Sequence, residues 1–504
     1  MPRHPLAWWG DPDALRPGGR AYAAFVTGTA LVTVLHWWLF FHLGSPRFAF
    51  TDWVKESASL EILRTSIRSG TIPWEQAHVI YHKTTLMAAN PELTLTPDVW
   101  LLPWLSNQGF FTLHVTGWAL IGLAGCLVLA ARGRIAPAPF VAVWLMAGFN
   151  GYVVTHLAMA HLMWTGYFCF PWLAVFVLDI QRSRSWRPAL LLGLALGVMV
   201  WNGSIHLVVA AALTLALLGV LLRRAFVRIA AAGAVGVLAG LGRLLPGAVY
   251  FPSPGEYLTG IPWGVLPKAF VTTWTYYSIG IRSLGQWEYS LFLGWCLLLL
   301  LLVGGAVGVV VKARASWPWL VAGAVLFLLS MDRYYEPLYA FGLPFSTERV
   351  STRFVAVPLL IGIAYAGLGL TSLVRRHRFI TFCVLALSAV GAVELARHSV
   401  HWSVGVMQRD LNDPMPDLTM VTNTDTRLHL TVWLSVAVSA LTVAATLVAL
   451  RRLAVVERRS RNDDADGRAP RRALPADAAA GGPRESRPQH ARRGVEADLP
   501  PRQD

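Results

Sequence analysis

The sequence predicts an all-α polytopic membrane protein with about twelve transmembrane helices, and three observations support this prediction. Hydrophobic residues make up 55% of the chain and charged residues 14%, and the mean hydropathy is +0.50. About twelve apolar runs approach the roughly 20 residues that a helix needs to cross a bilayer. The basic residues between these runs fall in every second connection. Composition, run length and charge alternation therefore all indicate a bundle of membrane-spanning helices.

The apolar runs occupy most of the chain and are joined mainly by short connections. They cover residues 21–43, 109–131, 138–157, 160–180, 188–203, 204–222, 227–250, 288–311, 317–331, 351–374, 378–397 and 428–450. The fifth and ninth runs are short, and their ends can move by several residues. We therefore expect one transmembrane domain over residues 21–450, preceded by a cytoplasmic N-terminus at residues 1–20.

The basic residues also predict the orientation of the helices. Arg132 and Arg134 follow the second run, and basic residues recur in alternate connections as far as Arg451. The intervening short connections near 158–160 and 202–205 carry no Lys or Arg. Since positive charge collects on the cytoplasmic side, we expect an inner (plasma) membrane protein with both termini in the cytoplasm. The long connections would then face outward: 44–108, 251–287, 332–350 and 398–427.

The net charge of +15 is then mostly a topology signal, because the arginines sit in short loops instead of forming one stripe. This distribution favours membrane lipids over nucleic acid as partners. The four cysteines all lie inside predicted helices and form no pattern of disulfides or metal ligands. Residues 451–504 are rich in Arg, Asp, Pro and Ala with few large apolar side chains, so we expect a disordered cytoplasmic tail there.

The first extracytoplasmic loop, residues 44–108, is the longest connection in the chain. A loop of that length is usually functional. Within it, residues 53–69 carry an apolar stripe at helical spacing, with most of the charged side chains elsewhere. We expect this segment to form an amphipathic helix that lies along the outer membrane surface.

Two carboxylates lie where this loop leaves the first predicted helix. Asp52 follows that helix by a few residues, and Glu56 comes one helical turn later on the same face. A carboxylate at this depth can act as general base on an acceptor hydroxyl, or help to hold a divalent metal. The alternative is a helix cap, in which Thr51 or Asp52 caps the following helix and Glu56 sits in its first turn. The two roles are compatible.

Arg349 and Arg353 lie where the chain re-enters the membrane from the outer side. An outward arginine pair departs from the charge alternation described above, so a binding partner is expected there. Guanidinium groups bind oxygens bidentately and stay charged, which suits the phosphate of a lipid-linked donor. The alternative is a structural pairing with Glu348 or Glu336.

Two histidines and two further charged residues complete the set of candidates. His156 and His161 flank the short outer turn between the third and fourth runs, where they could relay protons or bind phosphate. Their i,i+5 spacing is not a standard helical ligand spacing, so hydrogen-bonded histidines at a helix end are favoured over metal ligands. Glu288 lies at the outer mouth of the eighth run. Arg243, like Glu394, is a costly intramembrane charge that should pair or line a cavity.

Several short segments follow one another in a distinctive order over residues 20–375. They are Phe50-Thr51-Asp52-Trp53, Gly70-Thr71-Ile72-Pro73-Trp74, Ala88-Ala89-Asn90-Pro91-Glu92, Gly148-Phe149-Asn150-Gly151-Tyr152, Phe170-Pro171-Trp172, Trp287-Glu288-Tyr289 and Arg349-Val350-Ser351-Thr352-Arg353-Phe354. In this order they resemble the YfhO-type bacterial membrane proteins, which are relatives of the GT-C glycosyltransferases.

The resemblance implies a GT-C-like fold in the bacterial cell envelope. It also implies transfer of a sugar from a polyprenyl-phosphate donor to an extracytoplasmic acceptor, which could be a glycan, a lipid or a protein. Asp52 would then be the catalytic base, and Arg349 or Arg353 would hold the donor phosphate. Many such families carry a second acid in the connection between the third and fourth helices, where this chain has histidines.

Two other functions fit the same sequence. A transporter or flippase of a lipid-linked saccharide would also have about twelve helices and both termini inside, although carriers tend to show repeated halves with a site at the bilayer midplane. A non-catalytic GT-C-like membrane protein would keep the fold without the chemistry. We therefore expect a glycosyltransferase first and a carrier second.

Overall fold

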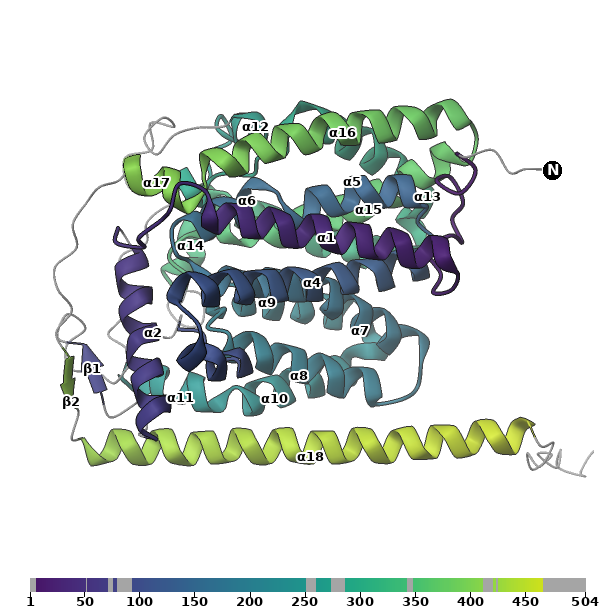
Figure 1. The fold of residues 1–504 in the computed structure, drawn as a ribbon. Helices are drawn as coiled ribbons and strands as arrows, with labels where there is room; N and C mark the ends of the chain where they lie inside the picture. Colours follow the sequence, from purple (N-terminus) through teal and green to yellow (C-terminus); the bar gives the residue numbers. More distant parts are fainter. Residues whose placement is uncertain are drawn as a thin grey trace, which may run out of the picture. The chain divides into compact units, whose positions relative to one another are not determined.

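The computed structural model describes residues 6–50, 52–70, 76–78, 93–250, 260–272, 286–341, 348–410, 420–422 and 425–465. Most of these residues are helical (Figure 1). The α-helices are α1 (Arg20–His42), α2 (Asp52–Ser69), α4 (Asn107–Gly133), α5 (Pro137–Gly148), α6 (Gly151–Ala158), α7 (Phe170–Arg182), α8 (Arg187–Trp201), α9 (Ile205–Leu221), α10 (Phe226–Ala239), α11 (Leu241–Tyr250), α12 (Leu266–Val271), α13 (Gly294–Leu329), α14 (Asp332–Tyr339), α15 (Ala356–Val374), α16 (Arg378–His401), α17 (Val404–Asp410) and α18 (Thr426–Ala465).

Shorter elements join these helices. The 3-10 helices are η3 (Pro97–Trp104), η4 (Leu162–Cys169), η5 (Arg223–Ala225), η6 (Gln286–Glu288) and η8 (Ser351–Val355). Two short strands, β1 (Gln76–His78) and β2 (Met420–Thr422), pair antiparallel and join the first predicted outer loop to the last one.

Eight helical segments in the described part of the chain are long and apolar enough to cross a membrane. Segments Ile205–Leu221 and Arg223–Ala239 meet this criterion only together and are bent by 114° at the break between them. Arg187–Trp201 and Ser316–Leu329 are apolar but shorter. Each predicted apolar run thus corresponds to a helical segment, and the chain has the fold of a polytopic helical membrane protein. Twelve spans stay a prediction, because the 15 residues of α8 rise only about 22 Å, less than the roughly 30 Å of a bilayer core.

The distribution of polar side chains also fits a membrane protein. Large apolar side chains point outward from the long helices, among them Leu35 on α1, Val310 on α13 and Phe379 on α16, which are 55%, 84% and 73% exposed. Polar residues such as His114 and Asn202 are buried between the helices. An apolar outer surface of this extent is stable only when another apolar phase covers it. Lipid tails supply that phase.

Helices α13 and α15 pack at backbone contact. Gly304 and Gly308 lie one helical turn apart on α13, and a Cβ on Gly304 would lie 2.8 Å from the carbonyl oxygen of Ala366. A Cβ on Gly308 would overlap the carbonyl group of Tyr365, and one on Gly369 would overlap the backbone of Gly304. Small residues at positions i and i+4 let membrane helices approach closely and gain dispersion contacts along their length. This contact fixes the position of η8, which directly precedes α15.

Helix α2 confirms the predicted helix in the first outer loop, and it runs across the ends of the bundle helices instead of alongside them (Figure 1). Leu60 and Leu63 from its apolar stripe are buried against protein. Arg64 connects α2 to η3, because its Nε donates a hydrogen bond to the carbonyl oxygen of Leu102 at 3.0 Å. The face that we expected to lie on lipid headgroups is therefore covered largely by the protein itself.

The N-terminal segment packs against the ends of α4 and α5. Asp13 accepts a hydrogen bond from Arg134 at 2.6 Å, and the carbonyl oxygen of Trp9 accepts one from the N–H of Ala138 at 3.1 Å. The hydrogen bond from Arg134 holds the pKa of the Asp13 carboxyl below its usual value and outweighs the opposing effect of burial. The N-terminal segment therefore lies beside the connection between α4 and α5, where Arg132 and Arg134 contribute to the charge pattern that predicts the orientation.

The chain divides into two units, residues 1–450 and 451–504. Helix α18 extends to Ala465, so the first part of the predicted disordered tail is helical. Its Arg, Ala, Leu and Glu residues are good helix formers, and they continue the helix beyond its apolar stretch. The remainder of the predicted tail and parts of the predicted outer loops lie outside the described residues: 51, 71–75, 79–92, 251–259, 273–285, 342–347, 411–419, 423–424 and 466–504.

Candidate functional site

The candidate site begins at a reversal of the chain after α6. Asn150 caps the start of that helix through its side-chain oxygen, and the helix ends at Ala158. Ala160 has a φ of +68°, and this left-handed residue turns the chain back on itself. The N–H of His161 then donates to the carbonyl oxygen of His156 at 3.1 Å. As a result the two imidazole rings meet, with their Nδ1 atoms 2.9 Å apart.

The hydrogen bond between the rings agrees with the expectation of hydrogen-bonded histidines at a helix end, but the i,i+5 spacing does not keep the two rings apart. Within one continuous helix, residues five apart point about 140° away from each other, so they could not share a ligand. The helix ends between His156 and His161, and the reversed chain brings the second ring onto the first. Trp164 lies beside both rings, with ring-centroid distances of 4.0 Å to His156 and 5.4 Å to His161.

Glu288 reaches the histidines because α6 has a glycine at its first position. The N–H of Gly151 donates to the carbonyl oxygen of Phe292 at 2.8 Å, and a Cβ at Gly151 would lie 2.5 Å from the backbone nitrogen of Phe292. Thr155 Oγ1 lies 3.1 Å from the carbonyl oxygen of Trp287. These contacts hold the segment after η6 against α6. Glu288 Oε2 consequently lies 3.8 Å from His156 Nε2.

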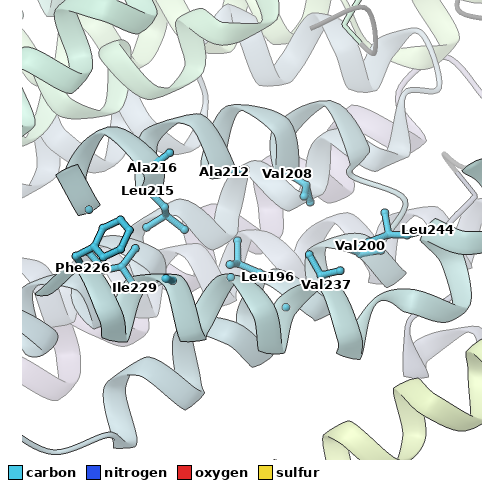
Figure 2. Close-up of a pocket in the computed structure, with 14 residues that line it drawn as sticks. Leu196, Val200, Val208, Ala212, Leu215, Ala216, Phe226, Ile229, Val237 and Leu244 are labelled. Carbon is cyan, nitrogen blue, oxygen red and sulfur yellow. The ribbon is translucent and has the colours of Figure 1, made fainter. Parts of the chain in front are cut away.

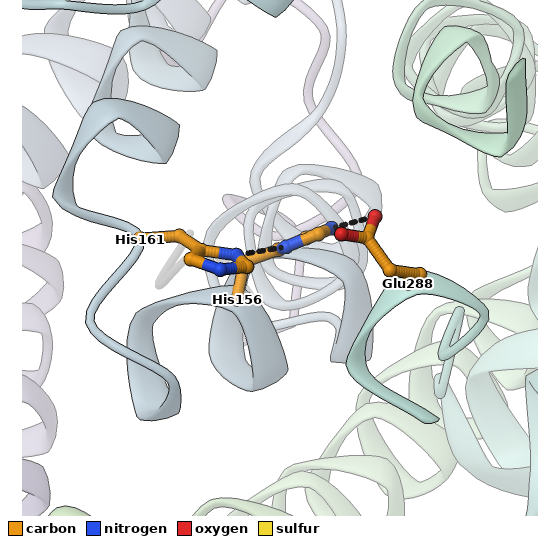
Figure 3. Close-up of side chains that lie close together, drawn as sticks. All are labelled: His156, His161 and Glu288. Carbon is orange, nitrogen blue, oxygen red and sulfur yellow. Dashed lines mark hydrogen bonds and ion pairs between the residues drawn. The ribbon is translucent and has the colours of Figure 1, made fainter. Parts of the chain in front are cut away.

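Figure 3 shows His156 between His161 and Glu288. One nitrogen of each imidazole and one oxygen of Glu288 lie within 4.8 Å of one another, and all three residues are buried. The turn that carries the histidines has no acid of its own, and Glu288 brings a carboxylate to it from a distant part of the chain. We call these three residues the His-His-Glu cluster.

Asp52 forms the outer end of the site. It begins α2, and its Oδ2 lies 3.4 Å from Nε2 of His161. The neighbouring Trp53 fixes this position, because its indole N–H donates to the carbonyl oxygen of Ala158 at 2.8 Å. The side chain of Asp52 is 43% exposed, whereas the ring of His156 behind it is fully buried. Asp52 is therefore the member of the site that solvent or a substrate can reach.

Arg353 forms the inner end. Its Nε donates to Glu288 Oε2 at 3.1 Å and its Nη2 to Glu288 Oε1 at 2.7 Å, a bidentate ion pair. The guanidinium carbon lies 5.0 Å from the ring centre of Trp164, and the hydroxyl of Tyr152 donates to the backbone carbonyl of Arg353 at 3.0 Å. Bidentate pairing and an aromatic face are the contacts that suit a guanidinium group best.

A second buried carboxylate, Glu348, completes the inner end. It accepts from Arg353 Nη1 at 3.4 Å and from the N–H of Val350 at 3.0 Å, and its Oε2 lies 2.7 Å from Nδ1 of His206. Burial alone would raise the pKa of this carboxyl. The interactions with His206 and with the Arg353 guanidinium outweigh that effect and hold the pKa of Glu348 below its ordinary value.

A second polar network lies on the other side of η4. Asp98 Oδ2 contacts Nδ1 of His114 at 2.6 Å, and Nε2 of the same ring contacts the hydroxyl of Thr165 at 3.2 Å. Asn202 donates to Thr165 at 2.8 Å and to Ser204 at 2.9 Å. Burial opposes ionisation of Asp98, but the hydrogen bond with His114 holds the pKa of its carboxyl below the usual value. This network links η3, α4, η4 and the turn between α8 and α9.

The other predicted site residues lie in different surroundings. Glu56 is buried one turn along α2, with an oxygen 3.9 Å from the ammonium group of Lys55. Arg349 is half-buried in the same segment as Glu348. Arg243 is buried and donates to the carbonyl oxygen of Leu93 at 3.0 Å.

Glu394, which we considered as a partner for Arg243, instead accepts hydrogen bonds at 3.2 Å from the backbone N–H groups of Trp295 and Cys296. Those two groups lie in the first turn of α13, where a helix leaves its N–H groups unsatisfied. The carboxylate therefore caps a helix.

Sequence reasoning did not single out His206 or Trp164 as members of the site, whereas Glu348 was named as a structural partner for the arginine pair and does contact Arg353 at 3.4 Å. His206 was one of several intramembrane histidines, and an intramembrane ionisable residue is by itself a signal of function. Trp164 gave no signal, because an aromatic residue in an apolar run is ordinarily part of the core. Only the packing of η4 against α6 and α9 brings its ring beside His156 and Arg353.

An apolar cavity of about 330 Å³ lies between α8, α9 and α10 (Figure 2). Val200 and Val208 lie at one end of it, and Phe226 lies at the other. Val208 follows His206 by two residues on α9, and Val200 precedes Asn202 by two. Helix α8 therefore ends, and α9 begins, at the polar networks described above.

The site thus combines an exposed carboxylate, two adjoining imidazoles, two buried carboxylates and one guanidinium group in continuous contact. Such a set can accept and pass protons, bind a cation, or orient an anionic group. No protein-family model matches the chain, and comparison with curated proteins gives no match.

Proposed function

We propose that the protein is a membrane glycosyltransferase that moves a sugar from a polyprenyl-phosphate donor to an acceptor on the outer face of the membrane. The observation that carries the proposal is the position of Asp52. Its carboxylate is 43% exposed and lies 3.4 Å from His161, at the edge of a buried polar site. A general base needs to be reachable by the acceptor and held in a fixed orientation.

In the proposed reaction, Asp52 removes the proton from an acceptor hydroxyl. The acceptor oxygen forms a bond to the anomeric carbon of the sugar, and the bond from that carbon to the phosphate oxygen breaks. The configuration at the anomeric carbon is inverted, and the polyprenyl phosphate leaves with the bonding electron pair. A guanidinium group near the leaving phosphate would stabilise the charge that develops on it.

Arg349 is the better candidate for that guanidinium group. Arg353 already has a bidentate pair with Glu288 and lies over Trp164, so a phosphate there would have to displace buried ionic contacts. Arg349 lies four residues earlier, is half-buried and follows Glu348 directly. We assign the donor phosphate to Arg349, and to Arg353 the role of holding Glu288 and Glu348 in place.

The apolar cavity supports an amphiphilic donor. Its volume of about 330 Å³ lies within the range of small-molecule sites, and its lining is apolar. A polyprenyl chain could occupy it while the phosphate and sugar stay near the ends of α8 and α9. On the positive-inside pattern we place this end of the bundle on the outer face of the inner membrane, with both termini in the cytoplasm.

The test compares two carboxylates on α2 in a producing cell. Asp52→Asn should abolish the outer-surface glycan that depends on the protein, because an amide cannot accept the proton. Glu61→Gln is the matched control, since Glu61 is 59% exposed and pairs only with Arg64 among the contacts described. Both proteins must be present at wild-type levels. An unchanged glycan in Asp52→Asn cells would remove Asp52 as the base.

One observation favours a second candidate, a proton-coupled carrier of a lipid-linked saccharide. The series from Asp52 through His161 and His156 to Glu288 connects an exposed carboxylate with a buried one, and carriers use such series as proton relays. Proteoliposomes separate the two functions. A carrier moves labelled lipid-linked sugar across the bilayer without a new glycosidic bond, whereas a transferase forms that bond.

A further inference from the structure

We propose that the His-His-Glu cluster is a binding site for a divalent transition-metal ion, with Zn²⁺ as the best fit. The ion would be held by one nitrogen from His156, one from His161 and a carboxylate oxygen of Glu288, which lie within 4.8 Å of one another. This inference does not depend on glycosyl transfer, because metal content can be measured without any activity.

The spacing of the donor atoms is close to that of ligands to a shared ion. The Nδ1 atoms of the two rings are 2.9 Å apart, somewhat closer than the ~3.4 Å between adjacent ligands of a tetrahedral ion at bond lengths of roughly 2.1 Å. Glu288 Oε2 and His156 Nε2 are 3.8 Å apart, too far for a hydrogen bond, and Nε2 of His156 is buried with no hydrogen-bond partner among the described residues. The two nitrogens of one imidazole point away from each other, so His156 would bind the ion through Nε2, beside Glu288. The ring of His161 would then shift toward that nitrogen, giving up its contact with Nδ1 of His156.

The identity of the donors selects the class of ion. Two imidazoles and one carboxylate form the protein ligand set of many catalytic zinc sites, and imidazole disfavours Mg²⁺ and Ca²⁺. Three protein ligands leave a coordination position for water or another oxygen ligand. The turn at Ala160 and the glycine at position 151 supply the local geometry that brings these donors together.

The surroundings provide the outer partners that metal-binding histidines normally have. Asp52 Oδ2 lies 3.4 Å from Nε2 of His161, which leaves Nδ1 of that ring for the ion, and a carboxylate in this position orients the ring and raises its basicity. On the opposite side, Arg353 holds both oxygens of Glu288. These contacts position the donors and partly balance the charge that the ion would bring.

The experiment measures metal in the full-length protein, purified in detergent, stripped with a chelator and dialysed against Zn²⁺ or Co²⁺. Wild type should retain a single ion per chain by elemental analysis. Cobalt-loaded protein should show visible absorption typical of nitrogen and oxygen ligands, and X-ray absorption should show two imidazoles on the zinc.

Variants assign the ion to this site. His161→Gln and Glu288→Gln should each lose the stoichiometric ion, and Asp52→Asn should weaken binding roughly 10- to 100-fold. His401→Gln is the matched control, a partly buried histidine at the end of α16, and it should bind as wild type does. Size-exclusion profiles and near-UV circular dichroism establish that each variant is folded.

Two results overturn the proposal. Wild type that binds no stoichiometric zinc or cobalt would overturn it without reference to any variant. Folded His161→Gln and Glu288→Gln that bind as tightly as wild type would place the ion elsewhere. Loss of glycan in Asp52→Asn cells together with a metal-free wild type would leave the transferase standing and remove only the metal.

Discussion

The backbone contact between α13 and α15 makes a quantitative prediction about Gly308. A Cβ there would lie 2.7 Å from the carbonyl carbon of Tyr365, where ordinary contact begins at 3.4 Å. The obstacle is backbone on the facing helix, so no side-chain rotation relieves it and the helices must separate locally. Overpacking of this kind costs about 1–3 kcal/mol, and the upper half of that range applies because the dispersion contacts of neighbouring turns are stretched as well.

Gly305 provides the control within the same turn of α13. A Cβ there meets no atom within 4 Å, so Gly305→Ala keeps the interface and loses only the conformational freedom of glycine. That change stabilises a helix by up to about 1 kcal/mol. Both variants gain this helix propensity, so it cancels in the comparison, and we expect Gly308→Ala to be less stable than Gly305→Ala by the overpacking cost of about 2–3 kcal/mol.

The assay is reversible unfolding by SDS in mixed micelles, followed by the fluorescence of the 22 tryptophans. Both variants should give one cooperative transition, with the midpoint of Gly308→Ala at lower SDS. Equal midpoints for the two variants would refute the reasoning, because they would mean that α13 and α15 do not touch through their backbones at this position.

Three further predictions concern the site. Arg353→Met should lower the free energy of unfolding by about 3–5 kcal/mol in the same assay, since it leaves buried carboxylates without their cation. Adding Glu288→Gln to this variant should recover part of the lost stability. If the effects of the two substitutions simply add, the ion pair between Arg353 and Glu288 does not contribute as described. The pKa of Asp98 lies below its ordinary value of 3.8, so its ionised form stabilises the fold fully above pH 3.8, and that contribution is lost as the pH falls through the lowered pKa. Unfolding midpoints between about pH 4 and pH 2 should therefore fall less steeply in Asp98→Asn than in wild type, and parallel curves would contradict this account. Gly151→Ala should displace the segment of Phe292, where a Cβ would lie 2.5 Å from the backbone nitrogen, and should lower stability and zinc content together; normal zinc content in this variant would show that Glu288 is positioned by other contacts.

Much of the fold could be predicted from local sequence. The apolar runs predicted every long helix, because the need to satisfy backbone hydrogen bonds in lipid leaves a helix as the stable form of such a segment. The amphipathic stripe predicted α2 in the same way. The 114° bend between Ile205–Leu221 and Arg223–Ala239 could not be predicted, because apolar composition does not indicate how a pair of helices turns at the break between them.

The candidate site was predicted only in its parts. Asp52, the two histidines, Glu288 and Arg353 stood out as charged or titratable residues near predicted helix ends, but their partners did not follow from the sequence. The i,i+5 spacing favoured hydrogen-bonded histidines over metal ligands, and the two rings do form a hydrogen bond; the left-handed residue at Ala160 that brings them together did not follow from the spacing. Arg243 and Glu394 were expected to pair with each other or line a cavity; Arg243 donates to the carbonyl oxygen of Leu93, and Glu394 caps α13.

The sequence by itself determined which segments are helices, which of them are apolar enough for lipid, and which side of the bundle collects positive charge. These properties depend on neighbours along the chain and on the solvent around it. Only the tertiary structure decided that Glu288 meets His156, because that contact depends on the absence of a side chain at Gly151 and on a segment more than a hundred residues away. Contacts of that kind arise from packing between helices, and no local pattern encodes them.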